Sequence, residues 1–295
     1  MEQILDTWFH SHGFVTSRAD PCVYIYHGSK NSKDFLAIAI HVDDMPIIDN
    51  NPNLRDSILE EMNKAFKVNF LGPANWILNM HIQHLDNGSF QIDQIRYIES
   101  MLERFNMTDC NPAKTPIVVD NSEDTSEPFD KNLYMQLIGS LLYLAVISRP
   151  DIAFAVSKVG QKAQNPTVKD WKTAKHILRY LAGTKHYLSY SPDGNINLEG
   201  YSDADWAGDP CTRRSTSGFV FRLAGAAISW MSKKQPIVAL SSTEAEYIAG
   251  SLATQEAIYL RTLFQDLENL SADATTMFID NQAIAWKGFY FQSLN

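Results

Sequence analysis

The sequence has little cysteine and no long apolar run. Its three cysteines, Cys22, Cys110 and Cys211, lie far apart without paired metal-ligand spacing, which is typical of an intracellular protein with free thiols. No stretch reaches the ~20 apolar residues that a membrane-spanning helix needs. The first residues lack the basic start and apolar core of a secretion signal. We therefore expect an intracellular protein, not secreted and without a membrane partner.

The chain also lacks an excess of positive charge. Its 25 Lys and Arg against 34 Asp and Glu give a net charge of −9, which argues against a nucleic-acid partner. The distribution is uneven, because residues 155–186 hold seven basic residues and one acid. This stretch fits either a phosphate-binding surface or a solvated helix face. The candidates for nucleic-acid contact within it are Lys158, Lys162, Lys172, Lys175 and Arg179.

Length and pattern predict about two domains of mixed structure. The 295 residues are 45% hydrophobic and 20% charged, as in globular proteins. Helices are predicted at residues 1–13 and 97–105, and strands at 22–27, 35–42, 76–82 and 89–92, with an Asn87-Gly88 turn before the last. Residues 120–130 carry five acids and no base, which predicts an exposed linker. Residues 131–188 are predicted to be mostly helical, with breaks at Pro150 and Pro166.

The last segment places carboxylates at the edges of different elements. A strand is predicted at 198–207, a hairpin at 218–223 and 227–232, a helix after Ser241 and a strand at 275–280. Ser241 and Glu244 predict a capping box, whereas Glu246 has no such local role. Separate elements that deliver carboxylates can hold two divalent cations, as metal-dependent nucleases require. The candidates are Asp203 or its neighbour Asp205, with Glu246 and Asp280; each also fits an ordinary turn or helix surface.

A second acidic pair, Asp43-Asp44, follows the apolar run 35–42 at the tip of a predicted hairpin. Two adjacent like charges repel each other, and a bound cation would offset that repulsion. Aspartate is also common in turns, so a purely structural interpretation stays open.

The last segment resembles the ribonuclease H domain of Ty1/copia-type retrotransposon Pol polyproteins. The similar phrases are Tyr-Ser-Asp-Ala-Asp-Trp-Ala-Gly (201–208), Arg-Arg-Ser-Thr-Ser-Gly-Phe-Val-Phe (213–221), Ile-Ser-Trp-Met-Ser-Lys-Lys-Gln-Pro (228–236) and Ala-Leu-Ser-Ser-Thr-Glu-Ala-Glu-Tyr (239–247). The resemblance implies that Asp203, Glu246 and Asp280 are catalytic and bind Mg²⁺, with Mn²⁺ as an alternative. The family has a fourth aspartate further on, which the tail from Trp286 does not match. We therefore expect an incomplete domain.

The first segment resembles the reverse-transcriptase palm of the same family. His41-Val42-Asp43-Asp44-Met45 is similar to its Tyr-Val-Asp-Asp-Met signature, which implies that Asp43 and Asp44 hold Mg²⁺ for nucleotidyl transfer. His41 replaces the usual tyrosine, and Pro46 removes a backbone donor from the returning strand. The family's remaining palm aspartate and its fingers would precede residue 1, so we expect no primer extension by this chain. Residues 137–144, 148–152 and 177–184 resemble the family's connection, and the whole resemblance covers roughly 9–285.

The expected fold is therefore mixed α+β. It comprises a partial palm (1–119), the acidic linker (120–130), a helical connection (131–190) and an incomplete ribonuclease H-like domain with a mixed sheet (191–295). The implied function is that of a Pol fragment that cleaves RNA in an RNA–DNA hybrid recognised by shape and backbone. Expected partners are such a hybrid or a template–primer and other Pol segments, in the cytoplasm, a virus-like particle or the nucleus. The alternatives are a catalytically dead remnant that at most binds nucleic acid and, on the −9 charge alone, a protein-interaction domain. The oligomeric state stays open.

Overall fold

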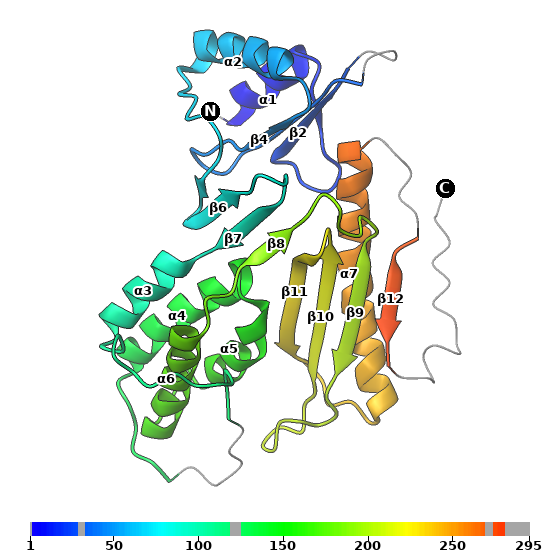
Figure 1. Ribbon diagram of the computed structural model, residues 1–295. Helices are drawn as coiled ribbons and strands as arrows, with labels where there is room; N and C mark the ends of the chain where they lie inside the picture. Colours follow the sequence, from blue (N-terminus) through cyan, green and yellow to red (C-terminus); the bar gives the residue numbers. More distant parts are fainter. Residues whose placement is uncertain (1, 29–32, 119–124, 269–273, 281–295) are drawn as a thin grey trace. The chain divides into compact units, whose positions relative to one another are not determined.

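The computed structural model describes residues 2–28, 33–118, 125–268 and 274–280, and it divides into two compact units (Figure 1). The first unit comprises Met1–Ile77 and Gln255–Ala274. The second comprises Leu78–Thr254 and Thr275–Asn295. Helix α7 (Ser242–Glu268) contributes its first half to the second unit and its second half to the first.

The first unit is built on an antiparallel sheet of order β1-β2-β3-β4 (Val15–Thr16, Val23–His27, Phe35–Ala39, Ile47–Asp49). The two-residue strand β5 (Trp76–Ile77), which is not part of this sheet, ends the first segment of the unit. Helices α1 (Glu2–Ser11) and α2 (Pro52–Phe66) supply Phe9, Ile58 and Met62 to a core shared with Leu36 and Ile38. Each such buried side chain contributes roughly 1.5–3 kcal/mol.

Helix α2 was not predicted, although the sequence carries its start signal. The Asn51 side chain accepts hydrogen bonds from the backbone N–H groups of Asn53 and Leu54, and Pro52 occupies the first turn. Both features are typical of helix N-termini. The charged residues Arg55, Asp56, Glu60, Glu61 and Lys64 obscure the apolar stripe, because only Ile58 and Met62 are buried.

The second half of α7 is anchored to the turn between β1 and β2. The Asp266 carboxylate accepts hydrogen bonds from Ser17 Oγ at 2.9 Å and from the Arg18 backbone N–H at 2.7 Å. The Arg18 guanidinium donates to the other carboxylate oxygen at 2.7 Å. His27 Nε2 lies 2.8 Å from the Asp266 carbonyl oxygen. This end of the helix is therefore fixed by polar contacts as well as by packing.

The second unit begins with strands and a helical layer. Strands β6 (Met80–His84), β7 (Phe90–Asp93) and β8 (Leu188–Tyr190) are antiparallel. Gly88 lies in the β6–β7 turn at φ +79°, as the Asn87-Gly88 pattern predicts, whereas β8 was not predicted. The helices are α3 (Ile95–Arg104), α4 (Lys131–Ile147), the 3₁₀ turn η1 (Pro150–Ile152), α5 (Ala153–Gly160) and α6 (Val168–Gly183). Their shared core includes the fully buried Tyr134, Leu137, Leu141, Leu144 and Ile177.

A mixed sheet and the first half of α7 complete the second unit. The order is β11-β10-β9-β12, with β9 (Glu199–Ala204), β10 (Thr216–Leu223) and β11 (Ala226–Lys234) antiparallel and β12 (Thr276–Ile279) parallel to β9. The hairpin turn has positive φ at both Ala224 and Gly225. Figure 1 shows α7 lying across one face of this sheet. Its buried Ala245, Ala249 and Ala253 permit a close approach of helix and sheet.

Several predictions can be compared with this fold. The combination of helices and sheets agrees with the predicted α+β class, and the mixed sheet is found at residues 199–279. Two predicted strands are shorter than expected: 35–42 ends at Ala39 and 198–207 ends at Ala204. The compact units divide after Ile77, whereas the predicted boundaries on either side of the acidic stretch 120–130 and at 190 stay predictions. Residues 119–124 of the linker and the tail beyond Asp280 lie outside the described residues.

Candidate metal centre

Topology brings three carboxylates to one end of the mixed sheet. Asp203 is near the end of β9, and Asp280 follows β12 directly. Because the two strands are parallel neighbours with Ile279 opposite Ser202, the two aspartates emerge side by side. Glu246 is in the first turns of α7, which starts at this end of the sheet. Carboxylate oxygens of all three residues lie within 4.8 Å of one another.

Glu246 is the buried member of this group. Its side chain is 5% exposed, whereas Asp203 and Asp280 are exposed. Burial raises the pKa of Glu246 to about 7; the Ala204 backbone N–H opposes that rise, and the Asp203 and Asp280 carboxylates add to it. Its Oε2 has no hydrogen-bond partner within the described part of the chain. A buried carboxylate oxygen without a partner is costly unless something positive approaches it.

This arrangement fits a divalent cation. Three carboxylates offer only hard oxygen ligands, which Mg²⁺ and Mn²⁺ prefer. A cation would satisfy Glu246 Oε2 and remove the repulsion between the three negative charges. Asp203, Glu246 and Asp280 are the residues that would hold it.

Asp205, the competitor of Asp203, has a structural role instead. Its Oδ1 accepts a hydrogen bond from the Thr216 backbone N–H at 2.5 Å, and its own N–H donates to the Thr216 carbonyl. It does not belong to the carboxylate group formed by the described residues. The geometry therefore favours Asp203 over Asp205 as the metal ligand.

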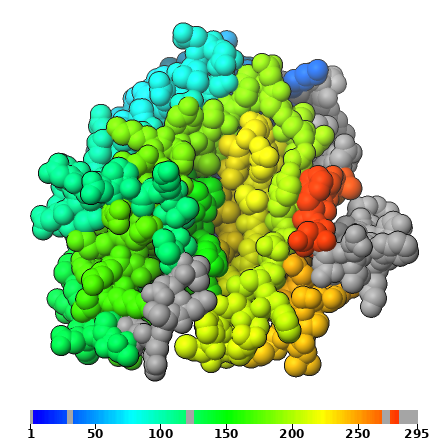
Figure 2. Space-filling view, turned by 60° about the horizontal axis from the view of Figure 1, so that its bottom comes forward, coloured from blue at the N-terminus to red at the C-terminus, as the bar shows by residue number. Residues whose placement is uncertain are grey.

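An open groove of about 600 Å³ adjoins the carboxylates. Asp203 and Asp280 line it together with aromatic and thioether side chains. The rings of Tyr201 and Phe278 stack there with centroids 4.8 Å apart. In Figure 2, β12 (red) continues the surface of the lime and yellow strands β9–β11.

Gln235 is a supporting residue that sequence reasoning missed. It is 2% exposed, and its Nε2 donates to Ser217 Oγ and to the Ala245 carbonyl, each at 2.9 Å. It therefore ties the end of β11 to the helix turn that carries Glu246. Within the predicted capping box, Ser241 Oγ accepts from the Glu244 N–H as expected, but the Glu244 carboxylate accepts from the Leu240 N–H. No local pattern around Gln235 predicts its burial.

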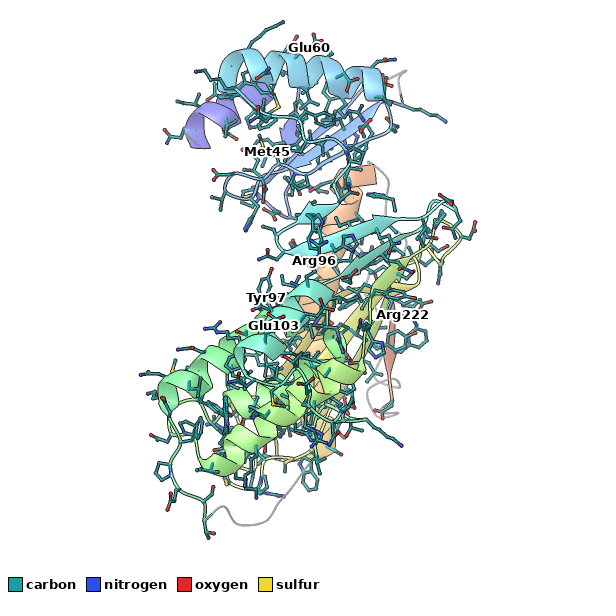
Figure 3. The ribbon with its side chains drawn as sticks, turned by 60° about the vertical axis from the view of Figure 1, so that its left-hand side comes forward. Met45, Glu60, Arg96, Tyr97, Glu103 and Arg222 are labelled. Atoms are coloured by element: carbon teal, nitrogen blue, oxygen red, sulfur yellow. The ribbon has the colours of Figure 1, made fainter. Side chains whose placement is uncertain are left out.

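Asp43 and Asp44 lie in an exposed turn of the first unit. His41 and Asp44 exchange two backbone hydrogen bonds of 2.9 Å, and Val42 is 85% exposed at φ +55°. The next residue, Met45, packs against the core of the first unit (Figure 3). The hairpin-tip position of the two aspartates matches the sequence expectation. The strand before them was expected to reach Val42, but β3 ends at Ala39. Within the described ranges no third metal-ligating side chain joins the two aspartates in a group.

The five basic candidates lie on or beside α5 and α6. Lys172, Lys175 and Arg179 share one side of α6 by their spacing of three and four residues. Lys175 Nζ is 5.9 Å from the Trp171 ring, and Arg179 Nε donates to the Asn111 carbonyl at 2.7 Å. Lys158 Nζ is 5.4 Å from the Phe154 ring, and Lys162 follows α5 in an exposed turn. Arg179, Lys175 and Lys158 therefore make contacts within the protein, and the role of all five residues in nucleic-acid binding stays a prediction.

The chain is similar to known reverse-transcriptase and retrotransposon proteins. Residues 1–119 match the family model of reverse transcriptase (RNA-dependent DNA polymerase). The retrovirus-related Pol polyprotein from transposon TNT 1-94 of Nicotiana tabacum is 36% identical over 94% of this chain and 22% of its own length. The putative transposon Ty5-1 protein of Saccharomyces cerevisiae is 32% identical over 74% of this chain and 73% of its own length. An uncharacterized mitochondrial protein of Arabidopsis thaliana is 35% identical over 74% of this chain and 92% of its own length.

The chain belongs to the family of Ty1/copia-type retrotransposon Pol polyproteins and contains reverse-transcriptase sequence of that family. This confirms the resemblance inferred from the sequence phrases. The chain spans about a fifth of the length of the Pol polyproteins that it matches. Among its described helices, each is too short or too polar to cross a bilayer.

Proposed function

We propose that the second unit is a ribonuclease H that hydrolyses the RNA strand of an RNA–DNA hybrid. The observation that carries this proposal is the convergence of Asp203, Glu246 and Asp280 around a buried glutamate oxygen that has no hydrogen-bond partner in the described ranges. The family membership supports a hybrid as substrate, because reverse transcription produces one.

In this proposal the protein's task is to hold three oxygen ligands in fixed positions. Asp203 and Asp280 are held by paired strands, and Glu246 by the helix turn that Gln235 ties to β11. The Ala204 N–H orients the Glu246 carboxylate. Mg²⁺, with Mn²⁺ as the alternative, would supply polarisation of the phosphate and activation of the attacking water. Recognition of the hybrid would depend on its shape and backbone.

The reverse-transcriptase sequence supports a second proposal for the first unit. Asp43 and Asp44 are exposed, and their adjacent carboxylates can share a Mg²⁺ with a template–primer and an incoming nucleotide. Two carboxylates do not complete the coordination of this ion, so further oxygen ligands must come from the substrate or from other Pol segments.

Hydrolysis of a labelled RNA–DNA hybrid tests the nuclease proposal. The purified chain is assayed with Mg²⁺ and with Mn²⁺, beside Asp203→Asn and Glu246→Gln. We expect metal-dependent cleavage that falls by at least about 100-fold in both variants, since each removes a ligand charge. Glu244→Gln is the matched control, because its amide oxygen can still accept from Leu240. Absence of cleavage by the folded wild type would leave the alternative, a remnant that at most binds nucleic acid.

A further inference from the structure

A loop with two arginines and a tryptophan extends from the carboxylate end of the sheet. Residues 205–215 join β9 to β10 and begin two positions after Asp203. Figure 1 shows this connection reaching beyond the lower end of the sheet. Trp206 is 56% exposed, and Arg213 and Arg214 are exposed. The loop therefore offers cations and an aromatic surface to a ligand in this region.

Asp209 folds the arginine-bearing part of the loop. Its Oδ1 accepts hydrogen bonds from the backbone N–H groups of Cys211 at 2.9 Å and Thr212 at 3.1 Å. The Arg213 N–H donates to the Asp209 carbonyl at 2.8 Å. Lys234 at the end of β11 forms an ion pair with the Asp209 carboxylate. The backbone that carries both arginines is therefore fixed before any ligand binds.

The other half of the loop is fixed as well. The Asp205 carboxylate binds the Thr216 N–H, and Ser215 Oγ accepts from the Ala207 N–H at 3.0 Å. A Cβ on Gly208 would collide with the Asp205 carboxylate, so a larger residue there would displace the carboxylate that binds the Thr216 N–H. The carboxylates of Asp205 and Asp209 are thus engaged in contacts with the loop and its flanking strands, whereas Arg213 and Arg214 are exposed to solvent.

Arg213 occupies an unfavourable backbone conformation. Its φ is +53°, in the left-handed region where glycine is preferred over residues with a Cβ. A glycine there would relieve strain and leave the turn intact. The position therefore allows side chain and backbone effects to be separated experimentally.

We propose that Arg213 and Arg214, together with Trp206 of the same loop, contact the sugar-phosphate backbone of the RNA–DNA hybrid on the side of the carboxylates. The guanidinium group suits phosphate because it donates paired hydrogen bonds and keeps its charge. An exposed indole adds a stacking surface for a sugar or base. The identity of the ligand rests on the proposed function, whereas the phosphate-binding character rests on the loop itself.

Fluorescence anisotropy with a fluorescein-labelled RNA–DNA hybrid tests this proposal on the full chain. EDTA keeps the hybrid uncut, so that binding is measured without hydrolysis. The double variant Arg213→Gly, Arg214→Ala should bind about 10-fold or more weakly, and the slope of log Kd against log salt should fall by roughly two. Arg222→Ala is the matched control. Arg222 lies near the far end of β10, the strand that follows the loop, where it donates to the Gly225 carbonyl, and binding should not change (Figure 3).

Thermal unfolding of the same proteins controls for folding. The Arg213→Gly single variant should have a Tm equal to or above that of the wild type, because strain is removed, and it should still bind more weakly. Equal affinity and equal salt slope for wild type and double variant would overturn the proposal, as would a wild type that binds no hybrid. Arginine-dependent binding without cleavage would overturn the proposed nuclease activity and support the proposed binding by Arg213 and Arg214. Cleavage with arginine-independent binding would support the nuclease activity and overturn the binding proposal.

Discussion

At the scale of single residues, Glu246 gives the physical reason to expect a cation at this site. Its carboxylate is buried, has one oxygen without a hydrogen-bond partner among the described residues, and faces two further acids. A folded protein tolerates such a group at a cost that a bound divalent cation removes. Metal binding should therefore stabilise the folded chain even when no substrate is present.

The first prediction at this scale is a metal-dependent rise in Tm. With Mg²⁺ at a hundredfold excess over its Kd, linkage gives about 2.7 kcal/mol of extra stability. Differential scanning calorimetry with Mg²⁺ and with EDTA measures it, and Glu246→Gln should lose most of the shift. Glu244→Gln, on the same helix turn but outside the group, should keep it. Equal shifts in both variants would place the bound metal elsewhere.

The second prediction at this scale concerns the ion pair between the buried Arg149 and Asp151, whose side chain is 28% exposed. Arg149 is 1% exposed and donates to the Asp151 carboxylate at 2.7 Å, and Tyr180 donates to the same carboxylate at 2.8 Å. Burial alone would raise the pKa of Asp151, but the Arg149 hydrogen bond and charge outweigh it and lower that pKa. The pair therefore contributes stability above the unfolded-state pKa of about 3.9 and loses it as pH falls through the folded-state pKa.

Asp151→Asn should accordingly lower the free energy of unfolding by roughly 3 kcal/mol near neutral pH, because it leaves the Arg149 charge buried and unpaired. Urea titrations at neutral and at acidic pH measure the difference between variant and wild type. That difference should shrink in acid. A difference that stays constant across this range would mean that packing, not charge, is lost.

At the scale of elements, α7 is held at both ends by polar side chains. Gln235 binds its first turn, and Ser17 and Arg18 bind Asp266 near its last. Asp266 is only 10% exposed, and although burial alone would raise its pKa, the hydrogen bonds from Arg18 and Ser17 lower it. Removal of its charge should therefore free the second half of the helix first.

Hydrogen exchange measures this effect directly. In Asp266→Asn, amides of residues 255–268 should exchange about 10-fold faster or more, while those of 242–254 keep their protection. Asp56→Asn is the matched control in the same unit, because Asp56 is 61% exposed and its ion pair with Arg55 is worth little. Uniform loss of protection along α7 would contradict separate anchoring of its two halves.

Elements with a clear period were predictable from the sequence, and those without one were not. The alternation at 199–204 and the Asn-Gly turn at 87–88 predict strands that the structure contains. Helix α2 was missed because its exposed charged face leaves a weak apolar stripe. The family resemblance named Asp203, Glu246 and Asp280, with Asp205 as a competitor of Asp203. The structure brings the first three carboxylates together, and the Thr216 hydrogen bond gives Asp205 a separate structural role. The roles of Asp209 and Gln235 depend on partners 25 and 10 residues away, which no local pattern reveals.

At the scale of the whole molecule, net charge is a poor guide to where nucleic acid would bind. The chain carries −9, yet Asp205, Asp209, Asp151 and Asp266 are all engaged in internal contacts. Arg213 and Arg214, in contrast, are exposed to solvent. The loop 205–215 is therefore more basic than the composition of the chain indicates, whereas Asp203 and Asp280 at the same end of the sheet stay exposed.

The first unit is formed by two separate segments of the chain, so it cannot complete its folding until the second segment has been synthesised. Strands β1–β4 end at Asp49 and leave the ribosome roughly 200 residues before the half-helix that begins at Gln255 and binds Ser17 and Arg18. At about 5–20 residues per second, that delay is on the order of ten seconds or more. Throughout this interval the nascent sheet exists without its last helix, and chaperones have time to reach it before the unit can close.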